Sequence, residues 1–225
     1  MTNIHISATI KDQVYQILKQ KICERFYKPG QWLQEKELAA YLSVSRSPVR
    51  EALRLLSNDG LVVEIPNKGV FVREFTPKDI MDIFDMRNIM ESYAIRHSQI
   101  NLTEDAVRDL KETVEELIEA HKQDDLKLYV EIDTDLHMQV IELGGNSIIC
   151  STYERLRSML QPFRIYSLLE RNRFNASVEE HSEMVKYILD GEPEKAVAVN
   201  SSHLKLAQNA VLDYMAEKQE EKENA

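Results

Sequence analysis

SRSPVREALR, residues 45–54, is the segment that decides the fold of the first part of this chain. Apolar residues within it and just after it recur at the spacing of one helix face: Val49, Ala52, Leu53 and Leu56. This stripe predicts a helix over Arg46–Asn58 that packs onto a small core. Three arginines follow one another at four-residue steps on a neighbouring face: Arg46, Arg50 and Arg54. An exposed arginine row at a helix N-terminus suits the major groove of DNA, where guanidinium groups pair with guanine or phosphate.

The flanking sequence supplies the context that such a helix needs. Helical periodicity predicts one helix over Ala8–Phe26 and a short one over Glu35–Leu42, followed by a tight break. After the arginine-bearing helix come two β-rich runs, Leu61–Ile65 and Val70–Val72. Residues 66–69, PNKG, join them and predict a hairpin with a partly basic tip. Three helices followed by a hairpin is the order of a winged helix-turn-helix.

The rest of the sequence indicates an all-helical domain. Thr76 and Pro77 are an N-cap residue and a first-turn proline, and they predict a new helix start. We expect six helices, with a kink at Pro162 in the fourth and a capping box of Ser177 and Glu180 opening the fifth. Their predicted ranges are Pro77–Ser98, Thr103–Gln123, Asp125–Leu143, Ser147–Glu170, Ser177–Asp190 and Pro193–Lys218. The predicted fold is mainly α: a winged helix-turn-helix domain in residues 1–75 and an antiparallel bundle of about six helices in residues 76–225.

Charge is distributed unevenly between these two parts. Of the 225 residues, 43% are hydrophobic, and the net charge is -10. Residues 1–75 hold 11 Lys and Arg against 8 Asp and Glu, a net of +3, and the remainder holds 17 against 30, a net of -13. The asymmetry indicates a DNA-facing part carried by a part with another task. Cys23 and Cys150 form no disulfide or thiolate-metal pattern, and no signal peptide or membrane-spanning stretch is evident, so we expect a cytoplasmic protein without a membrane partner.

Residues from about 8 to 75 resemble the GntR family of regulators. The residues that carry the resemblance are Pro29-Gly30, Leu33, Glu35, Leu38-Ala39, the run from Val44 to Leu53, Asp59-Gly60-Leu61 and Gly69. The resemblance implies DNA contacts from Lys36, Ser45, Arg46, Ser47 and Arg50, with the wing tip at Lys68 and Gly69. It also implies a homodimer that reads a palindromic operator, with half-sites about one helical turn apart.

Four residues in the second part have the chemistry of metal ligands. Asp133 and His137 are four residues apart on one predicted helix and therefore share a face. His181 and His203 lie on the fifth and sixth predicted helices. Three imidazoles and one carboxylate suit a first-row transition metal, but the spacing alone is a weak signal, because a lone histidine on a helix is usually a surface or core residue.

The same residues resemble the helical effector domain of the FadR branch of GntR regulators, in its shorter, VanR-like form. The matching pattern is Asp133 with His137, Gly145-Asn146, Glu180-His181, and His203. The resemblance implies a divalent metal, zinc or nickel, with a small carboxylate effector beside it. It implies that Arg87 clamps this effector and that Asn146 lies at the effector site. The alternative for Arg87 is a surface ion pair with Glu91, four residues on.

These features together predict a DNA-binding transcription regulator, a repressor, whose affinity for operator DNA depends on a bound organic acid. Two alternatives remain open from the sequence. An open metal site could activate water in a hydrolytic enzyme, although no base is evident beside the four residues. A purely structural metal would leave a DNA-binding protein that responds to no effector.

Overall fold

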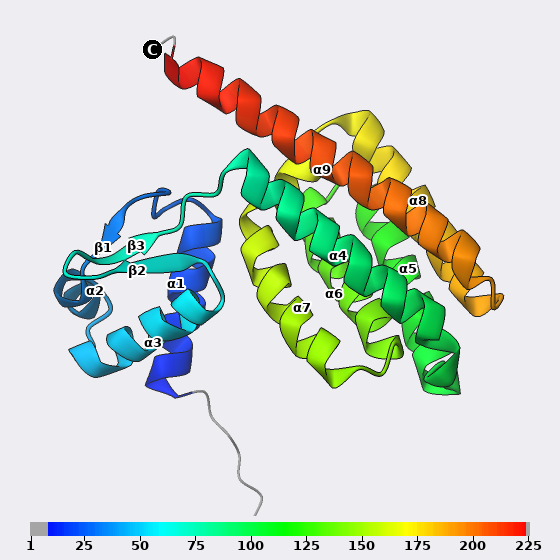
Figure 1. Cartoon of the computed structure of the whole chain (residues 1–225), viewed down its shortest axis with the longest axis horizontal. Coiled ribbons are helices and arrows are strands. Elements are labelled where there is room, and N and C mark those ends of the chain that lie inside the picture. Colours follow the sequence, from blue (N-terminus) through cyan, green and yellow to red (C-terminus); the bar gives the residue numbers. More distant parts are fainter. Residues whose placement is uncertain (1–8, 224–225) are drawn as a thin grey trace, which may run out of the picture. The chain divides into compact units, whose positions relative to one another are not determined.

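Residues 9–223 are described by a computed structural model, and their contacts divide the chain into two compact units with a boundary between Phe75 and Thr76. One unit contains all three strands of the described residues, and the other is helical (Figure 1). Ala8, the predicted start of the first helix, lies outside the described residues.

The N-terminal unit is built on three helices: α1 (Ile10–Cys23), α2 (Glu35–Tyr41) and α3 (Arg46–Asn58). α3 packs on both α1 and α2, and its buried residues are the four of the predicted stripe, Val49, Ala52, Leu53 and Leu56. The turn between α2 and α3 includes Ser43, whose φ of 56° is in the left-handed region. That turn lets α3 leave α2 abruptly, as a helix-turn-helix requires.

A three-stranded antiparallel sheet completes this unit. β2 (Val62–Ile65) and β3 (Gly69–Val72) form the predicted hairpin, with Val62 opposite Val72 and Ile65 opposite Gly69. β1 (Trp32–Leu33) pairs with the other edge of β3 and was not predicted. Two residues are too few to show the alternation from which a strand is recognised in sequence.

The C-terminal unit contains six α-helices and two short 3₁₀ segments among the described residues. The elements are α4 (Pro77–His97), η1 (Ser98–Ile100), α5 (Glu104–Lys122), α6 (Leu126–Leu143), α7 (Ser147–Leu160), η2 (Gln161–Leu168), α8 (Arg171–Leu189) and α9 (Pro193–Glu223). The most extensive packing joins α9 to α4 and to α8, and Figure 1 shows α4 alongside α9. Together with the N-terminal unit, this arrangement confirms the predicted fold class.

The predicted fourth helix is wrong in its second half. α7 ends at Leu160, and Gln161–Leu168 forms the 3₁₀ segment η2 instead of a kinked continuation. Pro162 lies at the start of η2. A proline has no N–H to donate and its ring clashes with the preceding turn, which ends an α-helix as readily as it bends one.

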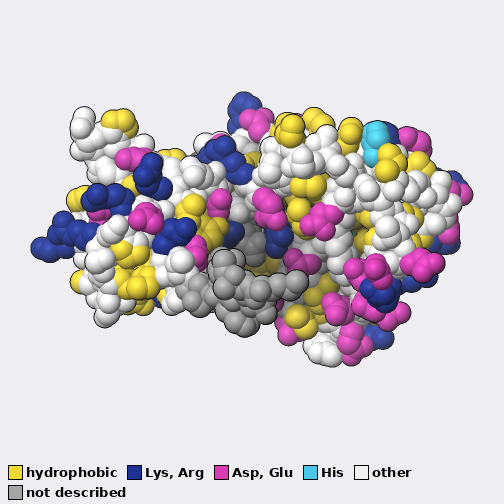
Figure 2. Space-filling view, turned by 90° about the horizontal axis from the view of Figure 1, so that it is seen from below, with side chains coloured by type: hydrophobic (Ala, Val, Ile, Leu, Met, Phe, Trp, Pro, Cys, Tyr) yellow, Lys and Arg dark blue, Asp and Glu magenta, His cyan; other side chains and the backbone are white. Residues whose placement is uncertain are grey.

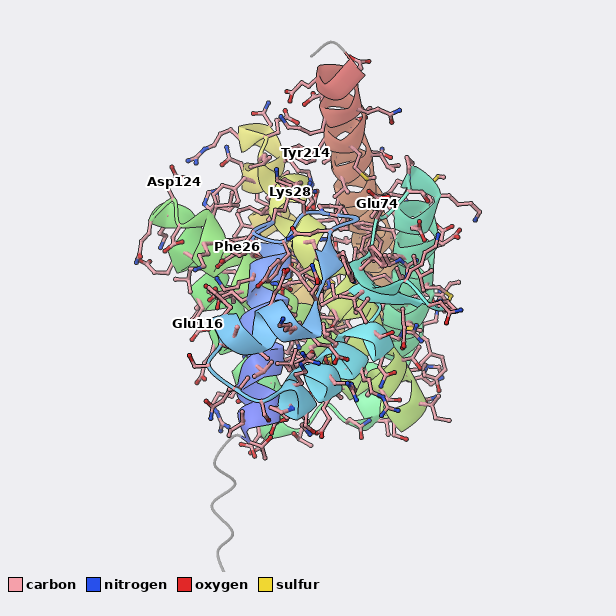
Figure 3. All side chains as sticks on the ribbon, turned by 90° about the vertical axis from the view of Figure 1, so that its left-hand side faces the viewer. Phe26, Lys28, Glu74, Glu116, Asp124 and Tyr214 are labelled. Carbon is pink, nitrogen blue, oxygen red and sulfur yellow. The ribbon has the colours of Figure 1, made fainter. Side chains whose placement is uncertain are left out.

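The predicted start of the fifth helix is also wrong. α8 begins at Arg171, six residues before Ser177, and Ser177 is buried within it. Arg171 forms an ion pair with Asp124, which lies in the turn between α5 and α6 and is labelled in Figure 3. Ser177 therefore caps nothing, and its hydroxyl accepts a hydrogen bond from Tyr129 at 3.0 Å.

The last helix is longer than predicted, since α9 continues five residues beyond Lys218, to Glu223. Lys218 itself pairs with Glu221, at 2.6 Å, within this last part of α9. Among residues 9–223, no helix is long and apolar enough to cross a bilayer.

Candidate functional site

The outer face of α3 carries the arginines that sequence predicts at DNA. Arg46, Arg50 and Arg54 are exposed, while the opposite face of α3 is buried. Arg50 donates through Nε and Nη2 to the two carboxylate oxygens of Glu35 on α2, both at 2.8 Å. This fork holds the Arg50 guanidinium against α2 and leaves 64% of its side chain exposed. Arg46 is the first residue of α3 and is therefore the arginine nearest to its N-terminus.

The other predicted DNA contacts are also on the surface of the N-terminal unit. Lys36, Ser45, Ser47 and Lys68 are exposed, and Gly69 is half-buried. Ser45 is the N-cap of α3, yet its side chain makes no capping hydrogen bond. Its hydroxyl and the first N–H groups of α3 are therefore available to a phosphate. In Figure 2, Lys and Arg side chains gather over the left edge of the N-terminal unit, and acidic side chains dominate the visible lower face of the helical unit.

Gly69 is required where the wing hairpin turns. Its φ is +108°, and a Cβ there would lie 2.6 Å from Nε1 of Trp32. We expect Gly69→Ala to destabilise the N-terminal unit by about 1–3 kcal/mol, because it adds backbone strain and a clash. Urea unfolding followed by Trp32 fluorescence measures this loss. Lys68→Ala, in the same turn but exposed, is the matched control. Equal stability of the two variants would contradict a structural need for glycine.

Four side chains converge in the interior of the helical unit. They are Asp133 and His137 of α6, His181 of α8 and His203 of α9, and all four are buried. One ligand atom from each lies within 4.8 Å of the others. Nε2 of His181 is 3.2 Å from Nε2 of His137 and 3.2 Å from Oδ1 of Asp133. Bonds of about 2.0–2.1 Å in a tetrahedral shell place neighbouring ligands about 3.3 Å apart, so these spacings fit a metal.

The far side of each imidazole ring is held by another side chain. Nδ1 of His137 lies 3.0 Å from Glu91, Nδ1 of His181 lies 3.1 Å from the Tyr129 hydroxyl, and Nδ1 of His203 lies 2.7 Å from Glu180. With the proton on Nδ1, each ring donates to its oxygen and keeps the Nε2 lone pair for a metal; at His203, Nη2 of Arg173 also lies 2.9 Å from Nδ1. Metal-binding histidines are oriented in this way by hydrogen bonds from the ring nitrogen that does not bind the metal.

The protonation states of three of the four residues, His137, His203 and Asp133, also suit a metal. Burial and the nearby Arg87 charge lower the pKa of His137 to about 4. Burial also holds the pKa of His203 well below its usual value. Burial alone would raise the pKa of Asp133, but adjacent His181 and His137 hold it well below its usual value. Neutral imidazoles and an ionised carboxylate are the forms that bind a metal, so the residues fit zinc or nickel.

A small cavity opens beside this cluster. Arg87, Arg164, Asp133 and His203 line it together with apolar side chains, and its volume is about 20 Å³, which holds about one water molecule. Arg87 is 3% exposed, so the surface position allowed as an alternative is wrong. Its predicted ion pair with Glu91 is present, with 2.6 Å between Nε and Oε1. Arg87 therefore faces the cavity and pairs with Glu91 at once.

Asn146 lies apart from this cavity. It is the N-cap of α7, and its side-chain oxygen accepts hydrogen bonds from the backbone N–H groups of Ile148 and Ile149. It is not among the residues that line the cavity. The structure thus gives Asn146 a capping role, and the effector site proposed below does not include it.

Sequence reasoning missed Arg164, which is 5% exposed and donates from Nη1 to Oδ2 of Asp133 at 2.5 Å. Burial and the charge of Arg87 lower the pKa of Arg164. It lies on η2, which was predicted as part of an α-helix. Tyr129 and Arg173 were missed as well, because single polar residues in a helical pattern carry no signal of what they contact.

A winged helix-turn-helix joined to a helical unit with a buried Asp-His cluster defines the class: a two-domain, DNA-binding transcription regulator. Residues 10–72 match the bacterial regulatory proteins of the gntR family, and residues 82–206 match the FCD domain. The chain belongs to the GntR family, in the group that carries an FCD domain. The proteins that these patterns describe are regulators and not enzymes.

Relatives match most of the length of this chain. The Nta operon transcriptional regulator of Aminobacter aminovorans is 25% identical over 83% of this chain and 87% of its own length. The gluconate operon transcriptional repressor of Bacillus licheniformis is 27% identical over 76% of this chain and 72% of its own. The solved structure of McbR/YncC from E. coli has a TM-score of 0.77 at 22% identity, covering 93% of this chain and all of that one, and shows the same fold.

Proposed function

We propose that this regulator is a homodimeric repressor whose affinity for a palindromic operator is set by a metal and a small organic acid in the helical domain. The observation that carries the proposal is the buried cluster of Asp133, His137, His181 and His203, in which Nδ1 of each histidine already contacts another side chain. A transition metal bound there supplies a Lewis-acidic centre with coordination positions open to an anion. Acting on chromosomal DNA, the protein would work in the cytoplasm.

The acid site is supported by the two arginines beside the cluster. Arg87 and Arg164 line the cavity with Asp133 and His203. Nη2 of Arg87, and Nε and Nη2 of Arg164, are buried without a hydrogen-bond partner among the described residues. Buried guanidinium nitrogens without partners are costly, and a carboxylate that reaches the metal and Arg87 would satisfy Nη2 of Arg87.

The dimer is supported by an exposed apolar stripe on α4. Met86, Ile89 and Tyr93 follow one another at helical spacing and are 43%, 62% and 37% exposed. A stripe of this kind on an otherwise polar surface marks a protein contact, and a second copy of the chain supplies the same stripe about a two-fold axis. A solution mass of twice 26.1 kDa is the expected result.

Regulation follows from linkage. If the acid binds one arrangement of the helical domain better than another, it changes the spacing of the two recognition helices in the dimer and hence the affinity for DNA. Bound DNA must then change the affinity for the acid by the same factor. The test is to titrate organic acids into metal-loaded protein on operator DNA while the metal is quantified by elemental analysis. Acid-induced release is expected. A bound metal with no effect of any acid on DNA affinity would leave the metal a structural role only.

Arg46 provides the test of the DNA-facing surface. We expect Arg46→Ala to weaken operator binding by about 1–3 kcal/mol if this arginine reads a base. The fluorescence anisotropy of labelled operator, compared with scrambled DNA, measures the loss. Arg108→Ala, an exposed arginine on α5, is the control. Unchanged operator binding by Arg46→Ala would place the DNA-binding surface elsewhere.

A further inference from the structure

Three arginine side chains are buried around the candidate metal centre, and each has a carboxylate partner. The pairs, with their N–O distances, are Arg87 with Glu91 (2.6 Å), Arg164 with Asp133 (2.5 Å) and Arg173 with Glu180 (2.6 Å). Among these residues, three carboxylates therefore balance three guanidinium groups. The histidine ligands are neutral when they hold a metal. A divalent ion thus adds two positive charges that none of these carboxylates balances.

A positive charge without a negative partner would destabilise this buried part of the helical unit. The three arginines are 3–7% exposed, and two of them, Arg87 and Arg164, line the cavity. Removing a charge from water costs several kcal/mol unless an opposite charge accompanies it. A ligand with a single negative charge would leave one positive charge over, whereas a ligand with two would balance the centre.

The second negative group has a matching donor in Arg164. Nη1 of Arg164 is taken by Asp133, and the two nitrogens without a partner among the described residues are Nε and Nη2. Nε–H and Nη2–H point out of the same edge of a guanidinium, and this edge accepts the two oxygens of one carboxylate. Arg87 offers no such edge, because its Nε is already engaged by Glu91 at 2.6 Å and by Tyr153 at 3.3 Å.

We propose that the effector is a small acid with two carboxylates. One carboxylate completes the coordination shell of the metal beside Arg87, and the second binds Nε and Nη2 of Arg164 together. This inference rests on the proposed function, which requires only one carboxylate, and it assigns to Arg164 the selection of diacids over monoacids.

A diacid needs more room than the cavity of about 20 Å³ offers. Five of the residues that line it belong to the end of α7 and to η2: Leu160, Phe163, Arg164, Ser167 and Leu168. A 3₁₀ segment has poorer hydrogen bonds than an α-helix, so η2 is the wall that can move outward with Arg164. Tyr166 of η2 stacks on Tyr214 of α9, which is labelled in Figure 3, with 3.9 Å between ring centroids. A shift of η2 would therefore be transmitted to α9.

The experiment compares diacids with their own monoamides on full-length, metal-loaded protein. Malonate, succinate and glutarate are each paired with the monoamide, which keeps the size and removes one charge. Affinity is measured by calorimetry and by the rise in Tm. For at least one pair, we expect the diacid to bind about tenfold more tightly or better, as two charge-assisted hydrogen bonds to Arg164 would give.

Two substitutions at Arg164 then test the assignment. Arg164→Lys keeps the charge and loses the two-nitrogen edge, and Arg164→Met loses both. Both are expected to abolish the preference for diacids. Arg157→Met is expected to keep it, because Arg157 of α7 is half-buried, pairs with Asp135 of α6 and does not line the cavity. Equal affinity of diacids and monoamides in the wild type, or a preference that persists in both Arg164 variants, overturns the inference and leaves the proposed function standing. If metal-loaded protein binds no acid at all, the proposed function fails as well.

Discussion

His181→Ala is expected to reduce bound metal from one ion per chain to an undetectable level after dialysis. His181 supplies the Nε2 atom that lies 3.2 Å from both His137 Nε2 and Asp133 Oδ1, and it is the only ligand of the four that comes from α8. Without it, α6 and α9 retain three ligands and lose the bond that joins them to α8. Elemental analysis of purified protein measures the metal content directly.

The same substitution should uncouple stability from metal. A metal present at 100 times its dissociation constant stabilises the folded state by about 2.7 kcal/mol. Added zinc should therefore raise the Tm of the wild type and leave that of His181→Ala unchanged. His97→Ala is the control, since His97 is exposed, lies outside the cluster of four residues, and contacts the carbonyl and the ring of Tyr93. A His181→Ala protein with wild-type metal content would show that the four residues are not the site.

The parts of this molecule that sequence predicted are those fixed by local spacing. Helical periodicity located α3 at its observed bounds, and the Thr76-Pro77-Asp79 signal located the start of α4, where the capping box is present. Asp133 and His137 share a face of α6 because they are four residues apart. Spacing could not connect them to α8 and α9. The resemblance to a family made that connection, and in the structure the four ligand atoms do meet.

The parts that sequence could not predict depend on contacts between distant segments. Arg164 reaches Asp133 across 31 residues, and Tyr129 reaches Ser177 across 48. In both pairs, the sequence around one residue contains nothing that indicates its partner. The start of α8 was misplaced because Ser177 and Glu180 have the spacing of a capping box while serving tertiary contacts: Ser177 bonds to Tyr129, and Glu180 bonds to Arg173 and His203. Tertiary packing outweighed the local signal there.

The largest loss of stability is expected from Glu91→Gln. Glu91 is fully buried, and its carboxylate accepts hydrogen bonds from Arg87 Nε at 2.6 Å, Tyr153 at 2.5 Å and His137 Nδ1 at 3.0 Å. Burial alone would raise the pKa of Glu91, but the Arg87 charge and the contacts with His137 and Tyr153 hold it well below the usual value, so it is ionised at neutral pH. Glutamine keeps the shape and removes the charge, which leaves Arg87 buried and unbalanced. Breaking a buried pair in this way costs about 3–5 kcal/mol, measured by urea unfolding of the metal-free protein.

The chain offers a matched control for this substitution in Glu194, which also forms a two-contact pair with an arginine. Arg96 donates to Glu194 through Nε at 2.8 Å and Nη2 at 3.1 Å, but the Glu194 side chain is 72% exposed. Water replaces the lost partner at such a position, so Glu194→Gln should unfold at nearly the same urea concentration as the wild type. Similar midpoints for both variants would show that the Glu91 carboxylate contributes little to folding. A large loss confined to Glu91→Gln would show that the folded state depends on this buried carboxylate, which holds both Arg87 and His137 in place.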